Sequence, residues 1–362
     1  MKKFFVFIIL IGLIVIAGAA LQAVFFVSSR PSPQKENVVF EVTPGLSLKR
    51  IAHLLEEQGL VTSAFKFQMY SRLSSGKRVR TGEYLLSKNM TPKEILNVLD
   101  SGKSIEYTLT IPEGFNKWDI ADELKKQKLG SREEFLRLVD NKAFIKELLG
   151  EDLPSLEGYL YPETYYLTKY TGARGLAKAM VARFLEVYPT VKQNSDIKMT
   201  RHQQVILASI IEKETGADNE RAQVASVFYN RTRIKMKLQT DPTVVYGILD
   251  SGRKYDGNIH RTDLTNPTRY NTYTNYGYPY GPISNPGKAS LEAALHPATT
   301  DYLYFVSRND GTHVFSKDLK SHEAAVGTFQ LDPKAREGKS WRDLKKNAAA
   351  AAAMTLAPAK TK

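Results

Sequence analysis

The N-terminus carries the longest apolar stretch of the chain. After Lys2 and Lys3, apolar residues run from Phe4 to Val27 with Gln22 as the only strongly polar interruption. A helix of this length can cross a hydrocarbon core of about 30 Å, and the lysines before it favour a cytoplasmic N-terminus. The alternative is a cleaved secretory signal, because small residues at positions 17–20 resemble a cleavage region, although the run exceeds the usual apolar length of about 7–15 residues. We expect a retained single-pass anchor in the cytoplasmic (inner) membrane, with the bulk of the chain in the periplasm or outside the membrane.

Beyond a polar, proline-bearing linker at residues 28–37, the apolar pattern repeats weakly at an offset of 69 positions. Each copy places a short β-prone segment, Val38–Val42 or Tyr107–Ile111, before a Pro/Gly turn and an amphipathic helix. The recurring positions are Gly45, Ile51, Ala52, Leu55, Gln58 and Leu60, matched by Gly114, Ile120, Ala121, Leu124, Gln127 and Leu129. The pattern predicts two related strand-turn-helix units.

A helix further along the chain carries a carboxylate on its apolar face. At about 100° per residue, Leu207, Ile210 and Glu214 fall within one stripe, whereas Glu212 points roughly opposite. A carboxyl group held against apolar walls is disfavoured in its charged form, so its pKa rises and it can donate a proton near neutral pH. Glu214 is therefore a candidate general acid. The alternative is that it ends the helix in solvent, because Gly216 follows as a C-terminal breaker.

Three turn-rich segments follow this helix, at residues 238–243, 270–273 and 280–287. They carry Tyr, Asn, Gln and Asp side chains, and loops on a rigid scaffold are where binding residues concentrate. Amides and carboxylates can bind sugar hydroxyls and N-acetyl groups, while aromatic rings pack on the apolar faces of pyranose rings. Turn chemistry or packing explains any one of these side chains equally well, but the cluster indicates a sugar-binding surface.

Other elements complete a mixed pattern. Residues 223–231 read as a largely buried helix, in which Asn230 and Arg231 either cap the helix or contact the site. Residues 302–306 and 313–316 read as strands joined through 309–311. Past Lys334 the composition turns charged and then alanine-rich, as in a tail that needs no function. Strands and helices in this order predict an α+β protein.

Composition narrows the class of protein. The 42% hydrophobic and 25% charged residues are ordinary for a globular chain. The absence of cysteine excludes disulfides, thiol catalysis and cysteine-bound metal, and the six histidines show no zinc-ligand spacing, so we expect neither a metal site nor a cofactor. The formal charge of +13 suits a partner rich in negative groups, but the dispersed lysines and arginines form no nucleic-acid-binding motif, so nucleic acid is not an expected partner.

Several separate motifs occur in a fixed order between about Val205 and His322, namely IIEKET, ASVFYNR, LQTDPTVVYG, YNTY, PISNPG, ALHPA and YLYFV. Together with the upstream segment at 156–165, they closely resemble the endolytic murein transglycosylase family of bacteria, often called YceG-like. The resemblance implies cleavage of the MurNAc-GlcNAc bond within peptidoglycan glycan strands, leaving 1,6-anhydro-MurNAc ends. In that family the catalytic glutamate precedes a Thr or Ser, which here selects Glu214 beside Thr215.

The resemblance also implies a reaction that consumes no water. Glu214 would protonate the glycosidic oxygen, and as a carboxylate it would then take the proton of the muramic acid C6 hydroxyl as that oxygen attacks C1. Two alternatives stay open: a lysozyme-like hydrolase in which Asp241 or Glu212 assists water, and a wall-binding scaffold without turnover. The side chains expected to orient the sugar are those of Thr215, Gln239, Asp241, Tyr246, Asn271, Tyr273 and Asn285.

These observations predict an α+β protein with a single N-terminal transmembrane helix, a small LysM-like module and an α+β catalytic domain. The LysM-like module resembles one that accompanies this family, and it serves either to bind N-acetylglucosamine polymers or as a spacer. The resemblance further implies cooperation with peptidoglycan synthases (penicillin-binding proteins), to release or terminate nascent strands. The expected boundaries are a cytoplasmic end at 1–3, the transmembrane helix at 4–27, the linker at 28–37, the LysM-like module at 38–105, a connecting region at 106–153, the catalytic domain at 154–333 and the tail at 334–362.

Overall fold

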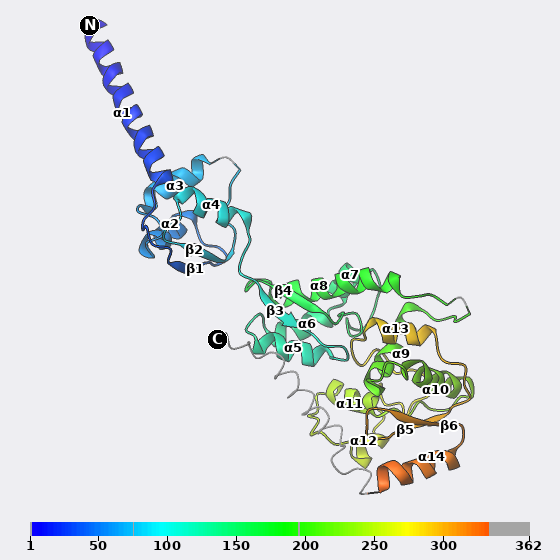
Figure 1. Cartoon of the computed structure of the whole chain (residues 1–362). Coiled ribbons are helices and arrows are strands. Elements are labelled where there is room, and N and C mark those ends of the chain that lie inside the picture. Colours follow the sequence, from blue (N-terminus) through cyan, green and yellow to red (C-terminus); the bar gives the residue numbers. More distant parts are fainter. Residues whose placement is uncertain (1, 75, 195, 333–362) are drawn as a thin grey trace. The chain divides into compact units, whose positions relative to one another are not determined.

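The computed structural model describes residues 2–74, 76–194 and 196–332 as a chain of mixed helix and sheet (Figure 1). This confirms the predicted α+β class; the predicted tail at 334–362 lies outside the described residues. Contacts divide the described chain into two compact units. The first reaches Leu109 and takes in Lys126–Gly130 and Tyr166–Gly172, and the second consists of Thr110–Lys125, Ser131–Tyr165 and the residues from Ala173 onward.

The first unit begins with a long apolar helix, α1 (Lys2–Ser28). Its segment Phe7–Ser28 has a mean hydropathy of 2.7, which is apolar enough to cross a membrane. Most of its described side chains are exposed, but Phe26 is buried and packs on the core of this unit. An N-terminal helix with these properties fits a membrane anchor and a signal sequence alike.

The first copy of the repeat forms the body of this unit. β1 (Asn37–Val42) and β2 (Gly82–Ser87) pair antiparallel, with Asn37 opposite Ser87. The helices α2 (Leu48–Glu57), α3 (Ala64–Leu73) and α4 (Pro92–Ser101) pack with the strands around a core that includes Phe40, Leu55, Phe67, Tyr84 and Leu96. Each helix begins where a hydroxyl side chain accepts a hydrogen bond from the backbone of its first turn, as Thr91 does in α4.

The second copy of the repeat has the same order of elements. β3 (Tyr107–Thr110) precedes α5 (Lys117–Lys126), each bound of which lies 69 positions after that of α2. The turn glycines also correspond, because Gly45 has a φ of 82° and Gly114 a φ of 78°, a region that glycine adopts without steric cost. The copies diverge after α6 (Arg132–Val139), where α7 (Lys142–Leu149) and a loop precede β4 (Thr164–Leu167), the partner of β3.

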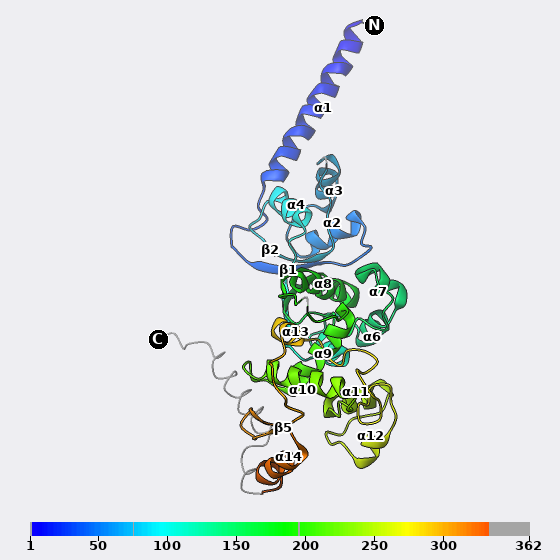
Figure 2. The same ribbon diagram turned by 90° about the vertical axis from the view of Figure 1, so that its right-hand side faces the viewer.

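The second unit is arranged around one enclosed helix. α9 (Arg201–Glu214) contacts α10 (Arg221–Arg233), α11 (Asp241–Asp250) and α13 (Lys288–Leu295), and it lies between α10 and α13 in Figures 1 and 2. All side chains from Gln204 to Ile211 are buried, so α9 is covered on every side rather than along one stripe. The other elements are α8 (Gly172–Val187), a 3₁₀ turn (Tyr188–Thr190), α12 (Arg261–Thr265), β5 (Tyr304–Ser307), β6 (His313–Ser316), α14 (Leu319–Val326) and a π-helical turn (Gly327–Leu331).

The segment predicted as a connecting region, 106–153, largely belongs to the second unit. The Gly114 N–H donates to the Asn285 carbonyl and the Asn285 N–H to the Phe115 carbonyl, both at 2.9 Å. The backbone N–H of Lys117 donates to the buried carboxylate of Glu157 at 2.9 Å. Residue contacts divide the chain near Leu109.

Candidate active site

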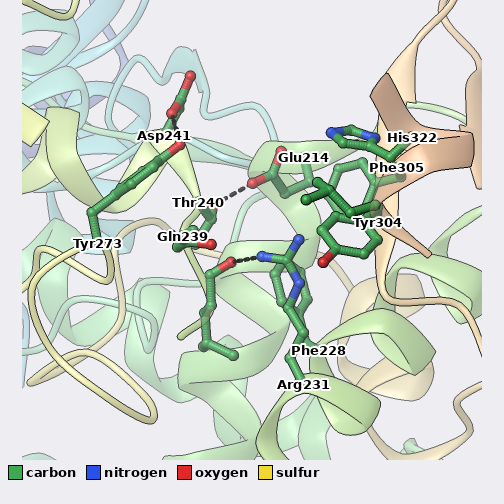
Figure 3. Close-up of a pocket in the computed structure, with 12 residues that line it drawn as sticks. Glu214, Phe228, Arg231, Gln239, Thr240, Asp241, Tyr273, Tyr304, Phe305 and His322 are labelled. Atoms are coloured by element: carbon green, nitrogen blue, oxygen red, sulfur yellow. Dashed lines mark hydrogen bonds between the residues drawn. The ribbon is translucent and has the colours of Figure 1, made fainter. Parts of the chain in front are cut away.

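The C-terminal end of α9 opens onto a cavity. A reciprocal cap between Thr200 and Gln203 begins the helix, and Glu214 is its last residue. The cavity has a volume of about 400 Å³, and its walls come from α9, α10, the 238–241 segment, β5 and α14. Its lining residues are Glu214, Phe228, Arg231, Leu238, Gln239, Thr240, Asp241, Tyr273, Tyr304, Phe305, Leu319 and His322 (Figure 3).

Glu214 is a half-buried carboxyl group on the wall of this cavity. Burial raises the pKa of Glu214 to about 7, and the negative charge of Asp241 acts in the same direction. A hydrogen bond from the Thr240 hydroxyl to Oε1 and the positive charge of Arg231 act against this rise. A carboxyl group with such a pKa exchanges its proton readily near neutral pH, which is the property that a group acting first as acid and then as base needs.

Three of the predicted sugar-orienting residues lie around the same cavity, namely Gln239, Asp241 and Tyr273. Asp241 is in the first turn of α11, and its Oδ1 accepts a 2.6 Å hydrogen bond from the Tyr273 hydroxyl. Gln239 has a φ of 48°, a left-handed conformation that is uncommon for a residue other than glycine. Its N–H donates to the Thr272 carbonyl at 3.2 Å, which holds this conformation in place.

Arg231 lines the cavity, which is one of the two roles that the sequence left open for it. Its Nε donates to the Leu303 carbonyl at 2.7 Å and its Nη1 to the Leu238 carbonyl at 2.6 Å. Its guanidinium carbon is 5.3 Å from the centre of the Tyr304 ring, and burial lowers its pKa. Arg231 thus joins the 238–241 segment to the chain leading into β5 and brings a positive charge near Glu214. The sequence around Arg231 does not indicate that its side chain binds these two backbone carbonyls.

An aromatic wall faces Glu214 from β5 and α14. His322 stacks on Tyr304 with ring centres 5.0 Å apart, and burial lowers the pKa of His322, so its imidazole is neutral near pH 7. In Figure 3, Glu214 lies between Thr240 on one side and Tyr304, Phe305 and His322 on the other. Among the residues that the structure describes, no group of His, Asp and Glu side chains could hold a metal ion. The cavity therefore offers one proton-exchanging carboxyl group between a polar and an aromatic wall.

Comparisons with known proteins identify the family. A sequence profile described as the YceG-like family matches residues 40–328. The chain belongs to the YceG-like family. It is 34% identical over 331 residues to an endolytic murein transglycosylase of Bacillus subtilis, a match that covers 86% of this chain and 90% of that protein.

Two further relatives extend the comparison. The YceG-like chain is 28% identical over 326 residues to an endolytic murein transglycosylase of Streptococcus pneumoniae strain D39, covering 81% of this chain and 58% of that protein. A crystal structure of a yceG-like protein from Listeria monocytogenes aligns with a TM-score of 0.54 at 34% identity, covering 81% of this chain and all of that one. The likeness therefore holds at the levels of both sequence and fold.

The YceG-like chain holds two other predicted sugar-orienting residues, Thr215 and Asn271, away from the cavity lining. Thr215 is buried and ends α9: its N–H donates to the Ile211 carbonyl and its hydroxyl accepts from the Ala217 N–H at 3.0 Å. Asn271 is also buried and organises its own loop, because its amide nitrogen donates to the carbonyls of Asp263, Leu264 and Asn266. The polar groups of both residues are satisfied inside the protein, and contact with sugar stays a prediction for each.

Tyr246 and Asn285 are the last two predicted sugar-orienting residues. Both bind the buried carboxylate of Glu157, to which the sequence analysis gave no role. Glu157 accepts hydrogen bonds from the Tyr246 hydroxyl at 2.9 Å and from the Asn285 amide at 2.7 Å. Burial raises the pKa of Glu157 to about 7, while the Lys117 N–H bond and positive charge and the Tyr246 hydroxyl bond oppose the rise. Asn285 and Tyr246 are at most 2% exposed. Both bind Glu157 in the structure, and contact with sugar stays a prediction for each.

Glu212 also differs from its expected environment. The helical phase placed it away from the interior, yet its side chain is only 6% exposed. Its Oε2 accepts a 3.0 Å hydrogen bond from the Gly287 N–H, and its Oε1 lies 3.9 Å from the guanidinium of Arg221. The prediction failed because α9 is enclosed on every side. Glu212 does not line the cavity of Glu214.

Replacing Asn285 by alanine is expected to lower the stability of the second unit by about 3 kcal/mol or more. The Asn285 side chain accepts from the N–H groups of Gly158 and Leu160 and donates to Phe115 and Glu157, and each buried polar partner left unsatisfied costs about 1–3 kcal/mol. Thermal or denaturant unfolding of the full chain measures the loss. Unchanged unfolding with weakened glycan binding would instead support the predicted sugar contact of Asn285.

Proposed function

We propose that this YceG-like chain is an endolytic murein transglycosylase that cleaves the MurNAc-GlcNAc bond within peptidoglycan strands. The observation that carries the proposal is Glu214, a half-buried carboxyl group whose pKa burial raises to about 7, on the wall of a cavity with polar and aromatic sides. Support also comes from the Bacillus subtilis relative, which bears this name and aligns over most of both chains.

In the proposed reaction, Glu214 acts twice. As an acid it protonates the glycosidic oxygen, and the substrate's own N-acetyl group offsets the positive charge at the anomeric carbon. As a carboxylate it then takes the proton from the muramic acid C6 hydroxyl while that oxygen bonds to C1. The product is a 1,6-anhydro-MurNAc end, and no water is consumed. A single carboxyl group with a pKa near neutrality suits both steps.

The neighbours of Glu214 orient its carboxyl group, stabilise its charge and position the sugar. Thr240 holds Oε1 by its hydroxyl hydrogen bond, which orients the carboxyl group. The buried charge of Arg231 stabilises the anionic form that the second step requires. Asp241, Tyr273 and Gln239 supply polar groups and one aromatic face on the same side of Glu214 as Thr240, where they orient the sugar.

A lysozyme-like hydrolase is the second candidate for this cavity. Of the two carboxylates that could assist water, Asp241 lines the cavity and Glu212 does not. Hydrolysis with Asp241 as the second carboxylate would leave a reducing muramic acid end. A wall-binding scaffold without turnover is the third candidate, and release of soluble fragments from purified sacculi in a zymogram separates it from both enzymes.

We further propose that α1 anchors the protein and that the first unit acts as a LysM-like module. The support is the apolar Phe7–Ser28 segment and the β1-α2-α3-β2 order of the first unit. An anchored enzyme of this class would act beside the peptidoglycan synthases (penicillin-binding proteins) that extend nascent strands, releasing or terminating those strands.

A reporter that is active only outside the cytoplasm is expected to work when fused after residue 37. The lysines at positions 2 and 3 keep the N-terminus inside, so the chain beyond α1 emerges on the other side. Mass spectrometry of the membrane-bound protein is expected to find residues 4–27 retained. Soluble protein that begins near residue 20 would show a cleaved signal peptide instead.

A further inference from the structure

A second cavity of about 600 Å³ belongs to the same unit as the catalytic one. Its lining residues are Thr232, Lys235, Met236, Tyr276 and Gly277. None of these residues lines the cavity of Glu214, and none has a role in the reaction proposed above.

Two short segments of the chain, 235–239 and 273–276, each contribute lining residues to both cavities. Lys235 lines the second cavity and Gln239 the first; likewise Tyr276 lines the second and Tyr273 the first. Four residues of fully extended chain span at most about 14 Å, so the two linings are separated by no more than a few sugar rings. The second cavity is therefore within reach of a polymer that is bound at Glu214 and extends past Tyr273.

The side chain of Lys237, which lies between Lys235 and Gln239 in the chain, links the two segments. Its ammonium group donates to the Tyr273 carbonyl at 3.0 Å and lies 5.0 Å from the centre of the Tyr276 ring. The segment also holds two left-handed residues other than glycine, Lys235 at a φ of 57° and Gln239 at 48°. Such conformations cost free energy and concentrate at sites that bind ligands, and here one lies in each cavity.

The chemistry of the second cavity matches a sugar polymer that carries carboxylates. Tyr276 is 71% exposed, which leaves an aromatic face open to solvent, and Met236 lines the same cavity. The apolar face of a pyranose ring packs on such a surface. Lys235, also exposed, adds a positive charge at the rim, which complements the carboxylates of peptidoglycan stem peptides.

We propose that this cavity is a second glycan subsite, which binds a neighbouring sugar of the strand that Glu214 cleaves. The sugar ring packs on Tyr276, and Lys235 pairs with a carboxylate of the stem peptide. The inference rests on the proposed function, because cleavage within a strand requires sugars bound on both sides of the reacting bond. Residues outside the cavity of Glu214 thus contribute to binding the strand and its stem peptide.

The test measures glycan binding by the full chain, in detergent, with Glu214→Gln as the common background so that no cleavage occurs. Adding Tyr276→Ala is expected to raise the Kd for peptide-bearing strands about tenfold, the size of effect that loss of an aromatic packing partner produces. Tyr280→Ala is the matched control, because Tyr280 is also exposed, packs against Arg269 at 4.4 Å, and lines neither cavity. It is expected to leave the Kd unchanged.

Lys235→Gln separates the peptide contact from the sugar contact. It is expected to raise the Kd for peptide-bearing strands severalfold but not the Kd for strands stripped of their peptides, whereas Tyr276→Ala weakens binding to both. Equal Kd values for Tyr276→Ala and Tyr280→Ala would overturn the subsite. Turnover by the protein with native Glu214 is measured separately, so a failure of the proposed reaction is distinguished from a failure of this binding site.

Discussion

Glu214→Gln is expected to lower the release of fragments from peptidoglycan by about 10²–10⁴-fold. The amide has nearly the same shape as the carboxyl group and still accepts the hydrogen bond of Thr240, but it can neither donate nor retrieve a proton. Single-turnover rates on purified glycan strands measure the loss. Turnover within about threefold of the unmodified protein would remove Glu214 from the mechanism.

Glu212→Gln is the matched control on the same helix. The Glu212 side chain is only 6% exposed. Its carboxylate accepts a hydrogen bond from the Gly287 N–H and faces Arg221 rather than the cavity. We expect this variant to lose some stability and to keep its turnover. The reverse pattern, with Glu212 essential and Glu214 dispensable, would show that the acid lies on the other side of α9.

Stability also separates a catalytic defect from a folding defect in Glu214→Gln. The pKa of Glu214 is raised by folding, from an ordinary 4.5 to about 7, so the folded protein holds this proton more tightly than the unfolded chain. The resulting stabilisation is complete below pH 4.5 and is lost as the pH rises to 7. Above pH 7 the neutral amide avoids the cost of a buried charge, so Glu214→Gln is expected to unfold at a temperature equal to or above that of the unmodified protein.

The rate of cleavage is expected to fall about tenfold for each pH unit above 7. The first step needs Glu214 protonated, and burial sets its pKa at about 7, so only about one molecule in a hundred is active at pH 9. The pH profile of kcat/KM, measured on purified glycan from pH 5 to 9, checks this decline, because kcat/KM reports the pKa of the free protein. A rate that stays constant to pH 9 would contradict the assignment of Glu214 as the acid.

Thr240→Val tests the same decline of the rate at alkaline pH, because it is expected to raise the pKa of Glu214. The Thr240 hydroxyl donates to Glu214 Oε1 and lowers the pKa of that carboxyl group, so its removal is expected to move the decline to higher pH. A merely structural role for Thr240 would lower the rate at every pH without moving the decline.

The sequence placed Glu214 on the inner side of its helix because the angle between residues in a helix is fixed whatever surrounds it. The same argument failed for Glu212. Periodicity identifies one buried face, but α9 is buried on all faces, and the partners that cover the second face, Gly287 and Arg221, are distant in sequence or on another helix.

Two of the three turn-rich segments, 238–243 and 270–273, supply residues that line the cavity of Glu214, and sugar binding by these segments stays a prediction. The amides of Asn271 and Asn285 can bind a sugar or a backbone equally well, and only the fold shows that carbonyls and the distant Glu157 already occupy them. The role of Arg231 was left open for the same reason, because the carbonyls that it binds belong to Leu238 and Leu303. Partners of this kind are set by long-range packing.

The most direct test of the proposed reaction is mass spectrometry of the fragments that the full chain releases from purified sacculi. A glutamate that serves as both acid and base, with the C6 hydroxyl as nucleophile, predicts products ending in 1,6-anhydro-MurNAc, and it predicts their absence when Glu214→Gln is used. Products ending in reducing MurNAc would contradict this account and favour a hydrolase in which Asp241 assists water.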